Sequence, residues 1–442
     1  MCRYLIFLIF SYFMLTLYAQ SDVNTPISGV GEPNYQNYHH RNYVSPTPNE
    51  IPIIASTVFN STIGPRQGDL NAVKDCGFNV CMDYASPEIF TQLLECMDGT
   101  GLRLLMQGES FMYHNNSVSR NWRQILPEFV DRFKDNPIVA GWKFCDEPKW
   151  NLLDEVRQRY DLLDNVDPGH LIYINLVGQL AKDFTGPCKT LPQYLDSIQV
   201  KLPMSVWSFD FYPIIIRNKK LNVEYDRFYG ALDAFSQKSK ETGKPMWSYL
   251  ESMEYSTKSN SRPAATLPYL SFAAFSSLAY GAQGLLYWTY WQRPSNDVET
   301  YKGALVNLEG EKLPAWYAAK KVNHQIKALT PVFLGAEMIE CRHTGEIGME
   351  GTYPYIRDFG PLEELSNDVK GVLVSHLQND GRNYLVIVNH DVENKQKVRM
   401  KFRNQLPVKR LVASDDGVLS TQSVNANYNV TLTQGGYAVF EY

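Results

Sequence analysis

The chain has 442 residues, of which 44% are hydrophobic and 20% are charged, and its formal net charge is −5. This length allows one large domain with a smaller one, or up to three ordinary domains, and the apolar share excludes a largely disordered chain. The negative charge and a pI near 6.0 argue against a surface for nucleic acid or for an anionic membrane.

The N-terminus has the pattern of a secretory signal peptide. A short basic start is followed by an apolar run from Leu5 to Ala19 and then by polar residues. The run is short for a transmembrane span, although an uncleaved anchor is the alternative. We predict a signal peptide over residues 1–19, secretion, and no integral membrane span after cleavage. Residues 20–50, rich in Asn, Pro and Tyr, are predicted to form an extended leader.

From residue 51 onward, strand-like and helix-like segments alternate. Eight segments are predicted as strands: Ile51–Phe59, Asn79–Tyr84, Leu102–Gly108, Ile138–Cys145, Leu171–Val177, Val206–Tyr212, Pro245–Leu250 and Gly284–Trp291. Helical patterns follow them at Gln67–Cys76, Pro87–Met97, Asn121–Phe133, Leu152–Asn165, Leu191–Val200, Tyr225–Thr242, Ala265–Tyr280 and Pro314–Leu329. Eight βα units predict an α/β fold, a closed (β/α)8 TIM barrel over residues 51–334. An open doubly wound sheet is the alternative, but the first turn lacks the Gly-rich motif for a nucleotide.

Residues 335–442 have a different pattern of predicted elements. Short strand patterns alternate with Asp-Gly, Asn-Asp-Gly and Gly-Gly turns, and the strands are predicted at Val369–Leu377, Tyr384–Asn389, Lys397–Phe402, Arg410–Ala413, Tyr428–Leu432 and Tyr437–Tyr442. This pattern predicts a small all-β sandwich domain.

The cysteines do not suggest a metal or redox centre. Apart from Cys2, which precedes the apolar run, six cysteines are scattered without a C-x-x-C pair. We predict buried free thiols, with one chance disulfide as the alternative. The six are Cys76, Cys81, Cys96, Cys145, Cys188 and Cys341.

Two carboxylates stand where predicted strands end. Glu147 ends the fourth strand, in Gly-Trp-Lys-Phe-Cys-Asp-Glu-Pro, and Glu251 ends the seventh, in Pro-Met-Trp-Ser-Tyr-Leu-Glu. The carboxyl ends of barrel strands form the active-site face, and a carboxyl pair across a polar cleft is typical of glycosidic-bond cleavage. The alternative is a structural role for each Glu, either as a solvated cap at the strand end or as a partner in an ion pair. Glu254 is the alternative to Glu251 for the second catalytic carboxylate. We prefer Glu251 because it directly ends an apolar run.

The fourth-strand motif resembles that of the large clan of retaining (β/α)8 glycoside hydrolases with catalytic Glu residues after strands four and seven. Its Asp-Glu-Pro form is similar to family-42-like β-galactosidase relatives and to secreted β-glucan hydrolases of gut Bacteroidetes. The resemblance covers about residues 51–330 and implies that Glu147 is the acid/base and Glu251 the nucleophile. It implies no cofactor or metal. Asp146 stands where the clan commonly has an Asn that contacts the sugar 2-hydroxyl, and an Asp cannot donate an amide proton there.

The same resemblance implies further sugar contacts. Tyr212, at the end of the sixth strand, is expected to hydrogen-bond the nucleophile, and Trp288 and Trp291 on the eighth strand are expected to form an aromatic platform. A core position is the alternative for each Trp. Asp210 shares a strand face with Tyr212 and is predicted to contact sugar hydroxyls, although a structural Asp satisfied by backbone is an equal alternative.

More distant mouth residues complete the predicted site. Trp150, just beyond the fourth strand, is predicted to add a sugar subsite, and Glu109 and His114 are predicted to contact hydroxyls near the third strand. Asp83, near the end of the second strand, is a further candidate. For Asp83, Glu109 and His114 a structural role is the favoured alternative.

Together these features predict a secreted retaining β-glycoside hydrolase that acts on a β-linked oligo- or polysaccharide. The aromatic share of 13%, with 28 Tyr and 8 Trp, agrees with a protein that stacks sugars. The alternatives are a non-catalytic glycan-binding protein on the same scaffold, and an inverting hydrolase or transglycosylase. A carbohydrate is the expected partner, with no nucleic acid. For the C-terminal domain, structural support is favoured over separate carbohydrate binding.

Overall fold

A computed structural model describes residues 44–108, 121–258, 260–345, 355, 357–367 and 370–442. The predicted signal peptide, the leader up to residue 43, Glu109 and His114 lie outside the described residues. Within the described ranges, no helix combines the length and the apolar character needed to cross a bilayer.

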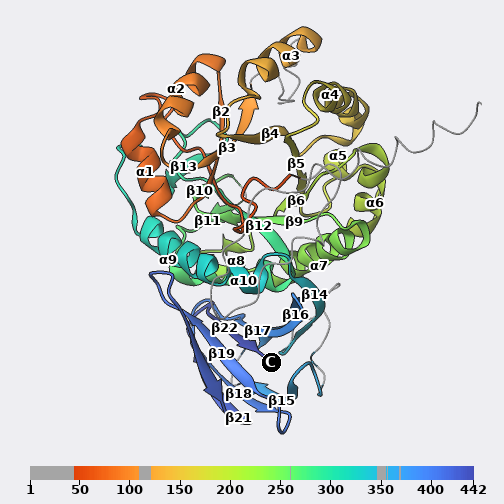
Figure 1. The fold of residues 1–442 in the computed structure, drawn as a ribbon, viewed down its shortest axis with the longest axis vertical. Helices are drawn as coiled ribbons and strands as arrows, with labels where there is room; N and C mark the ends of the chain where they lie inside the picture. The colour runs from red at the N-terminus through yellow and green to blue at the C-terminus, as the bar shows by residue number, and fades with distance from the viewer. Residues whose placement is uncertain (1–43, 109–120, 259, 346–354, 356, 368–369) are drawn as a thin grey trace, which may run out of the picture.

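Eight parallel strands close into a barrel in which each strand pairs with its neighbours in chain order (Figure 1). The barrel strands are β1 (Ile53–Ser56), β2 (Val80–Ala85), β3 (Arg103–Gly108), β4 (Val139–Asp146), β5 (Leu171–Val177), β6 (Trp207–Asp210), β9 (Met246–Glu251) and β12 (Ala282–Trp288). These strands are buried almost throughout, as expected for a parallel sheet covered on both faces. The predicted (β/α)8 barrel is confirmed, with β4 as the fourth barrel strand and β9 as the seventh.

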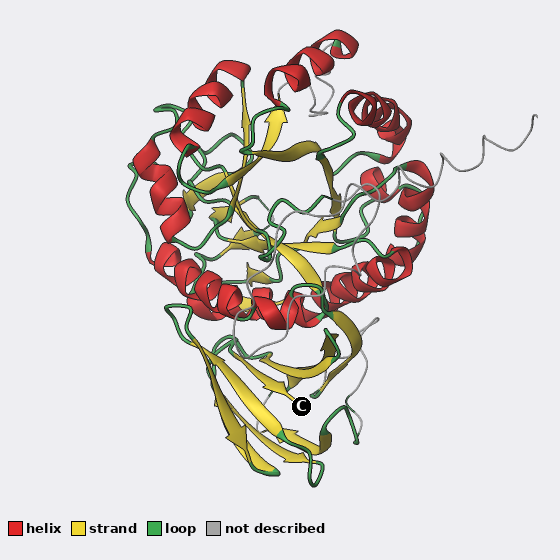
Figure 2. Cartoon of the chain, viewed as in Figure 1, coloured by secondary structure: helices red, strands yellow, loops and turns green. Residues whose placement is uncertain are grey.

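Helices surround the barrel (Figure 2). They are α1 (Gln67–Asp75), α2 (Pro87–Met97), α3 (Trp122–Phe133), η2 (Trp150–Leu152), α4 (Leu153–Val166), α5 (Lys182–Thr185), α6 (Leu191–Lys201), α7 (Tyr225–Thr242), α8 (Leu267–Ala279), α9 (Pro314–Ala328) and α10 (Thr330–Phe333). Proline occupies the first turn of α2, α6, α8 and α9, where its missing N–H costs no intrahelical bond. At the carboxyl end of α7, Gly243 takes the left-handed conformation that commonly ends a helix.

A small sheet that the sequence did not indicate is built from insertions after β6, β9 and β12. Its strand order is β13-β10-β11-β7-β8. The strands are β7 (Ile214–Arg217), β8 (Lys220–Val223), β10 (Glu254–Ser256), β11 (Ser261–Arg262) and β13 (Thr300–Gly303). Because these insertions follow the carboxyl ends of barrel strands, the sheet lies at the barrel mouth and brings Tyr255 and Arg262 there.

The C-terminal part is the predicted all-β domain (Figures 1 and 2), with a six-stranded sheet β14-β16-β17-β22-β19-β20 and a three-stranded sheet β15-β18-β21. The strands are β14 (Glu337–His343), β15 (Leu362–Asn367), β16 (Val372–Asn379), β17 (Arg382–Asn389), β18 (Gln396–Phe402), β19 (Val408–Ala413), β20 (Leu419–Val424), β21 (Asn427–Leu432) and β22 (Tyr437–Glu441). A core that includes Val374, Ile387 and Phe440 lies inside this domain.

The two domains are firmly joined. The larger sheet packs on α8, α9 and α10, and Leu373 and Val439 belong to the same apolar cluster as the barrel helices. The Tyr225 hydroxyl donates to the carbonyl of His390 at 2.6 Å, and the Tyr280 hydroxyl lies 2.9 Å from Nε2 of His343. This shared core agrees with structural support as the role of the domain.

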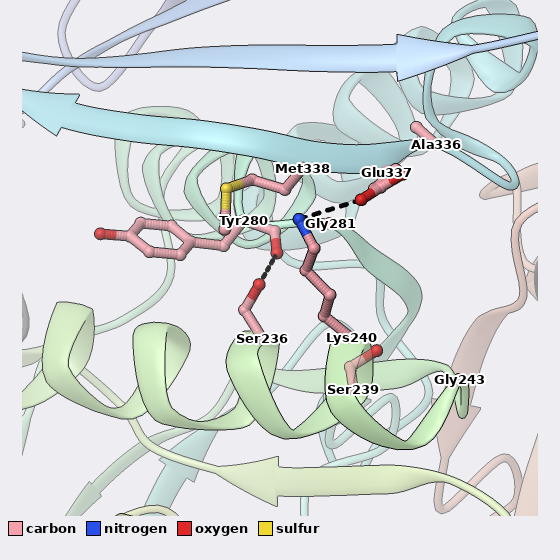
Figure 3. Close-up of a pocket in the computed structure, with 9 residues that line it drawn as sticks. All are labelled: Ser236, Ser239, Lys240, Gly243, Tyr280, Gly281, Ala336, Glu337 and Met338. Carbon is pink, nitrogen blue, oxygen red and sulfur yellow. Dashed lines mark hydrogen bonds and ion pairs between the residues drawn. The ribbon is translucent and has the colours of Figure 1, made fainter.

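A cavity of about 300 Å³ lies at this junction (Figure 3). Lys240 reaches across it to pair with Glu337 at 2.9 Å, and Ser236 donates to the carbonyl of Tyr280 at 2.7 Å. The cavity borders the carboxyl end of α7 and the residues just before β12. It therefore opens at the end of the barrel opposite the strand termini that carry Glu147 and Glu251.

Candidate active site

Glu147 directly follows β4 and has an unusual backbone. Its φ is +43°, a left-handed conformation that non-glycine residues rarely adopt. A hydrogen bond from its N–H to the carbonyl of Asn175 at 3.0 Å helps to hold this conformation, although the following Pro148 favours an extended backbone at this position. Backbone strain of this kind concentrates at functional sites, which makes Glu147 a stronger candidate than its position alone would.

The carboxyl group of Glu147 is held in its protonated form. Burial raises its pKa most, the neighbouring negative charge of Asp210 raises the pKa further, and a hydrogen bond from the protonated Glu147 to Asp210 adds to the rise. The two groups therefore share one proton. A carboxylic acid that keeps its proton near neutral pH is what a general acid requires.

A polar network on β4, β5 and β6 fixes this pair. Asn175 Nδ2 donates to Asp210 Oδ1 at 3.1 Å and to Asp146 Oδ1 at 3.2 Å. Asp146 Oδ2 also pairs at 3.2 Å with Nζ of Lys143, whose side chain is only 7% exposed. Ser208 donates to Asn175 Oδ1 at 3.0 Å, so the Asn175 amide is fixed at both ends. Each oxygen of Asp146 already has a partner within the protein.

A glycine brings the ends of β5 and β6 together at this network. The N–H of Gly178 donates to the carbonyl of Asp210 at 3.2 Å, and a Cβ on Gly178 would lie 2.7 Å from that oxygen. Only glycine allows this approach without a shift of the backbone.

Glu251, at the end of β9, has a much less polar environment. Its side chain is 11% exposed, and its Oε1 has no hydrogen-bond partner among the described residues. Arg262 faces Glu251, with its Nε 3.8 Å from that oxygen. Burial raises the pKa of Glu251 to about 8, and the charge of Arg262 opposes this rise.

Aromatic rings surround Glu251. Trp288 pairs in register with Glu251, and its ring stacks on Tyr212 with centroids 6.0 Å apart and planes 24° apart. Tyr255 and Tyr301 meet the same indole edge-on, at 5.5 and 6.0 Å. Trp288 is partly exposed, so this half of the mouth offers a flat apolar surface.

A cavity of about 320 Å³ opens at the barrel mouth beside Glu147. It is lined by Glu147 and Asp210, by Tyr212, by the segment after β5 that includes Gln179, and by residues of the small sheet such as Tyr255. The cavity places the shared proton of Glu147 and Asp210 in contact with a space that a small ligand can enter.

The predicted site residues fall into three groups. Glu147, Asp146, Asp210, Tyr212, Glu251 and Trp288 gather at the mouth. No hydrogen bond joins the Tyr212 hydroxyl to Glu251 among the described residues, so the expected contact with the nucleophile is absent here. Glu109 and His114 lie outside the described residues.

Trp291 and Trp150 occupy other positions. The prediction that Trp291 stacks on sugar is wrong, because its ring is 1% exposed and packs in the core against Gly310, where it presents no face to a ligand. Trp150 lies against Gly186 of the α5 terminus and 5.7 Å from Nζ of Lys201, and its role as a subsite stays a prediction. Asp83 accepts hydrogen bonds from two backbone N–H groups, as its structural alternative requires.

Several functional neighbours were missed in the sequence. Lys143 and Asn175 are polar residues inside apolar strands, and this was a readable signal, because buried polar groups need partners. Arg262 and Tyr255 gave no such signal, since they lie in an insertion whose path no local pattern specifies.

No protein-family model matches the chain, and no curated protein is significantly similar to it in sequence. Its fold, however, is similar to solved β-galactosidase structures. A catalytic mutant of Gan42B, a GH42 β-galactosidase from G. stearothermophilus, aligns with a TM-score of 0.62 and 10% identity, over 93% of this chain and 99% of that chain. The β-galactosidase from Bacillus circulans sp. alkalophilus aligns with a TM-score of 0.61 and 10% identity, over 89% and 99%. These similarities establish a shared fold.

Proposed function

We propose that the protein is a retaining β-glycoside hydrolase with Glu147 as acid/base and Glu251 as nucleophile. The observation that carries the proposal is the pair itself, two enclosed carboxyl groups at the carboxyl ends of the fourth and seventh barrel strands. The fold shared with β-galactosidases supports the same reaction class.

In the first step, an oxygen of the ionised Glu251 carboxylate attacks the anomeric carbon while the bond from that carbon to the leaving oxygen breaks. The proton of Glu147 passes to the leaving oxygen. In the second step, Glu147 takes a proton from water, whose oxygen displaces Glu251 from the sugar. Asp210 contributes by keeping Glu147 protonated before the first step.

Glu254 is less suited to attack. Its carboxylate is 33% exposed and pairs with Lys302 at 3.5 Å on the small sheet. Glu251, by contrast, lies among the rings of Trp288, Tyr212 and Tyr255, where water is largely excluded and a bound sugar would be shielded.

The test is a screen of β-linked glucans, galactans and mannans with the wild type, Glu147→Gln, Glu251→Gln and the matched control Glu254→Gln. We expect the first two variants to lose turnover by at least about 10³-fold while staying folded, and the control to remain active. The NMR spectrum of the first product should show the anomeric configuration of the substrate. An inverted product would replace the double displacement by a single one, and a wild type inert on the whole panel would favour a glycan-binding protein.

We also propose that the protein is secreted with cleavage after Ala19, on the strength of the N-terminal sequence alone. N-terminal sequencing of the mature protein tests this, because an anchored chain would keep its apolar segment.

A further inference from the structure

The cavity beside Glu147 carries more positive charge than a neutral sugar requires. Its charged lining consists of three arginines and three acidic residues: Arg217, Arg227, Arg262, Glu147, Asp210 and Glu224. Since Glu147 keeps its proton, the lining has three positive and at most two negative charges near neutral pH.

Two of the arginines have donors to spare. Arg217 Nη2 lies 3.1 Å and Arg227 Nη1 lies 3.5 Å from the same oxygen, Oε1 of Glu224. Each guanidinium has five N–H donors, so one shared oxygen leaves most of them unused. The two side chains are 61% and 57% exposed, whereas Glu224 is 14% exposed, so the arginines extend toward the open side of the cluster.

The third arginine is already committed. Arg262 donates to the backbone carbonyls of Tyr212 and Ile214 and faces Glu251. It therefore fixes the small sheet, and Arg217 and Arg227 remain as the groups that can bind a ligand.

The placement of Arg227 adds to this. It lies in the first turn of α7, an 18-residue helix, where the helix dipole favours negative charge. Arg227 shares this turn with Asp226 and pairs with Glu224, while Arg217 approaches the same turn from the end of β7. The positive end of the helix and the two guanidinium groups therefore face the same space, which favours an anionic ligand.

We propose that Arg217 and Arg227 bind the anionic group of an acidic sugar, a hexuronate carboxylate or a sulfate ester, within the substrate. This rests on the proposed function and deepens it by naming the substrate class. Guanidinium groups bind such oxyanions through paired, charge-assisted hydrogen bonds. A substrate bound in this way reaches Glu147, because the same cavity is lined by both.

The test measures binding separately from turnover. Calorimetry with Glu251→Gln at low salt compares three probes: a β-linked disaccharide with a hexuronate, its carboxyl-reduced counterpart, and its sulfated counterpart. We expect an anionic probe to bind at least about tenfold more tightly than the neutral one, and salt to reduce the difference. Adding Arg217→Ala or Arg227→Ala should weaken anionic binding by about 10- to 100-fold and neutral binding by less than about threefold.

Arg66→Ala is the matched control. Arg66 is 51% exposed, pairs with Asp69 at 2.8 Å at the start of α1, and does not line the cavity. Its removal should leave both affinities unchanged. Preference for the hexuronate or for the sulfate identifies the source of the anion, and either supports the proposal.

Two results would overturn it: equal affinity for anionic and neutral probes, or unchanged anionic affinity in both arginine variants. Hydrolysis is assayed in parallel with the wild type. Tight anionic binding without hydrolysis would defeat the proposed function alone. Hydrolysis of neutral glycosides without anionic preference would defeat the arginine site alone.

Discussion

The two halves of the barrel mouth give a glutamate carboxyl group two different environments. On the β4–β6 side, Glu147 is set in a network of carboxylates and amides and shares its proton with Asp210. On the β9–β12 side, Glu251 lies among aromatic rings, and its Oε1 lacks a hydrogen bond within the described residues. Burial raises the pKa of both, but only Glu147 has a second carboxylate to hold its proton. Identical carboxyls thus become suited to different steps.

The largest expected effect separates two tryptophans of the aromatic half. Trp291→Ala should destabilise the fold by about 3–5 kcal/mol, because its ring is fully buried. Trp288→Ala should cost less stability, since the ring is partly exposed, but should lower kcat/KM by about tenfold through the lost platform.

Chemical denaturation and steady-state kinetics of both variants provide the measurement. If Trp291→Ala kept wild-type stability, or if Trp288→Ala kept wild-type kcat/KM, the division between core and platform would be mistaken.

The polar half is tested by Asp210→Asn. Losing the negative charge should lower the pKa of Glu147, so the alkaline limb of the kcat/KM profile should move to lower pH. We expect kcat/KM above neutral pH to fall by about 10²-fold, or about 2.7 kcal/mol in transition-state stabilisation.

Asp183→Asn, an exposed carboxylate on α5, is the control and should leave the profile unchanged. Asp210 positions the proton of Glu147, so a loss of rate with an unmoved alkaline limb would assign it a merely structural role.

The barrel and the order of its strands were predictable from the sequence, because each βα unit has its own hydrophobic pattern. Glu147 and Glu251 followed from that order. Asn175 and the proton shared with Asp210 did not, since they depend on how neighbouring strands are registered. The prediction for Trp291 failed because an aromatic residue at a strand end gives the same sequence pattern whether it faces a sugar or the core. The small sheet with Arg262 lies in insertions whose strands are only two to four residues long, which is too short for a recognisable pattern.

A smaller effect concerns the folding stability that is lost by burying Glu251 among the aromatic rings. Because the folded pKa of Glu251, about 8, exceeds its unfolded value, the folded state binds more protons than the unfolded state between about pH 4.5 and pH 8. Stability should therefore fall as pH rises through this window, by up to about 1.4 kcal/mol per unit. Glu251→Gln removes the group and should be more stable than wild type at pH 7, by on the order of 1–3 kcal/mol.

Denaturation at pH 4, 6 and 7.5 measures this difference, which should vanish at pH 4. Glu254→Gln, on the partly exposed neighbour, should follow the wild type at every pH. A Glu251→Gln curve parallel to wild type across the range would mean that Glu251 is ionised at no cost in the folded protein.

The smallest effect concerns Arg262, whose guanidinium faces Glu251. Its charge lowers the pKa of Glu251 against the effect of burial, so Arg262→Gln should raise that pKa further. Because the nucleophile must be ionised, the acidic limb of the kcat/KM profile should move up by about one pH unit, with up to tenfold lower activity at pH 7. Activity should recover at higher pH, which distinguishes lost charge from a displaced small sheet. A uniform loss at every pH would instead show that Arg262 acts through its hydrogen bonds to Tyr212 and Ile214, and that the aromatic half tunes Glu251 by exclusion of water alone.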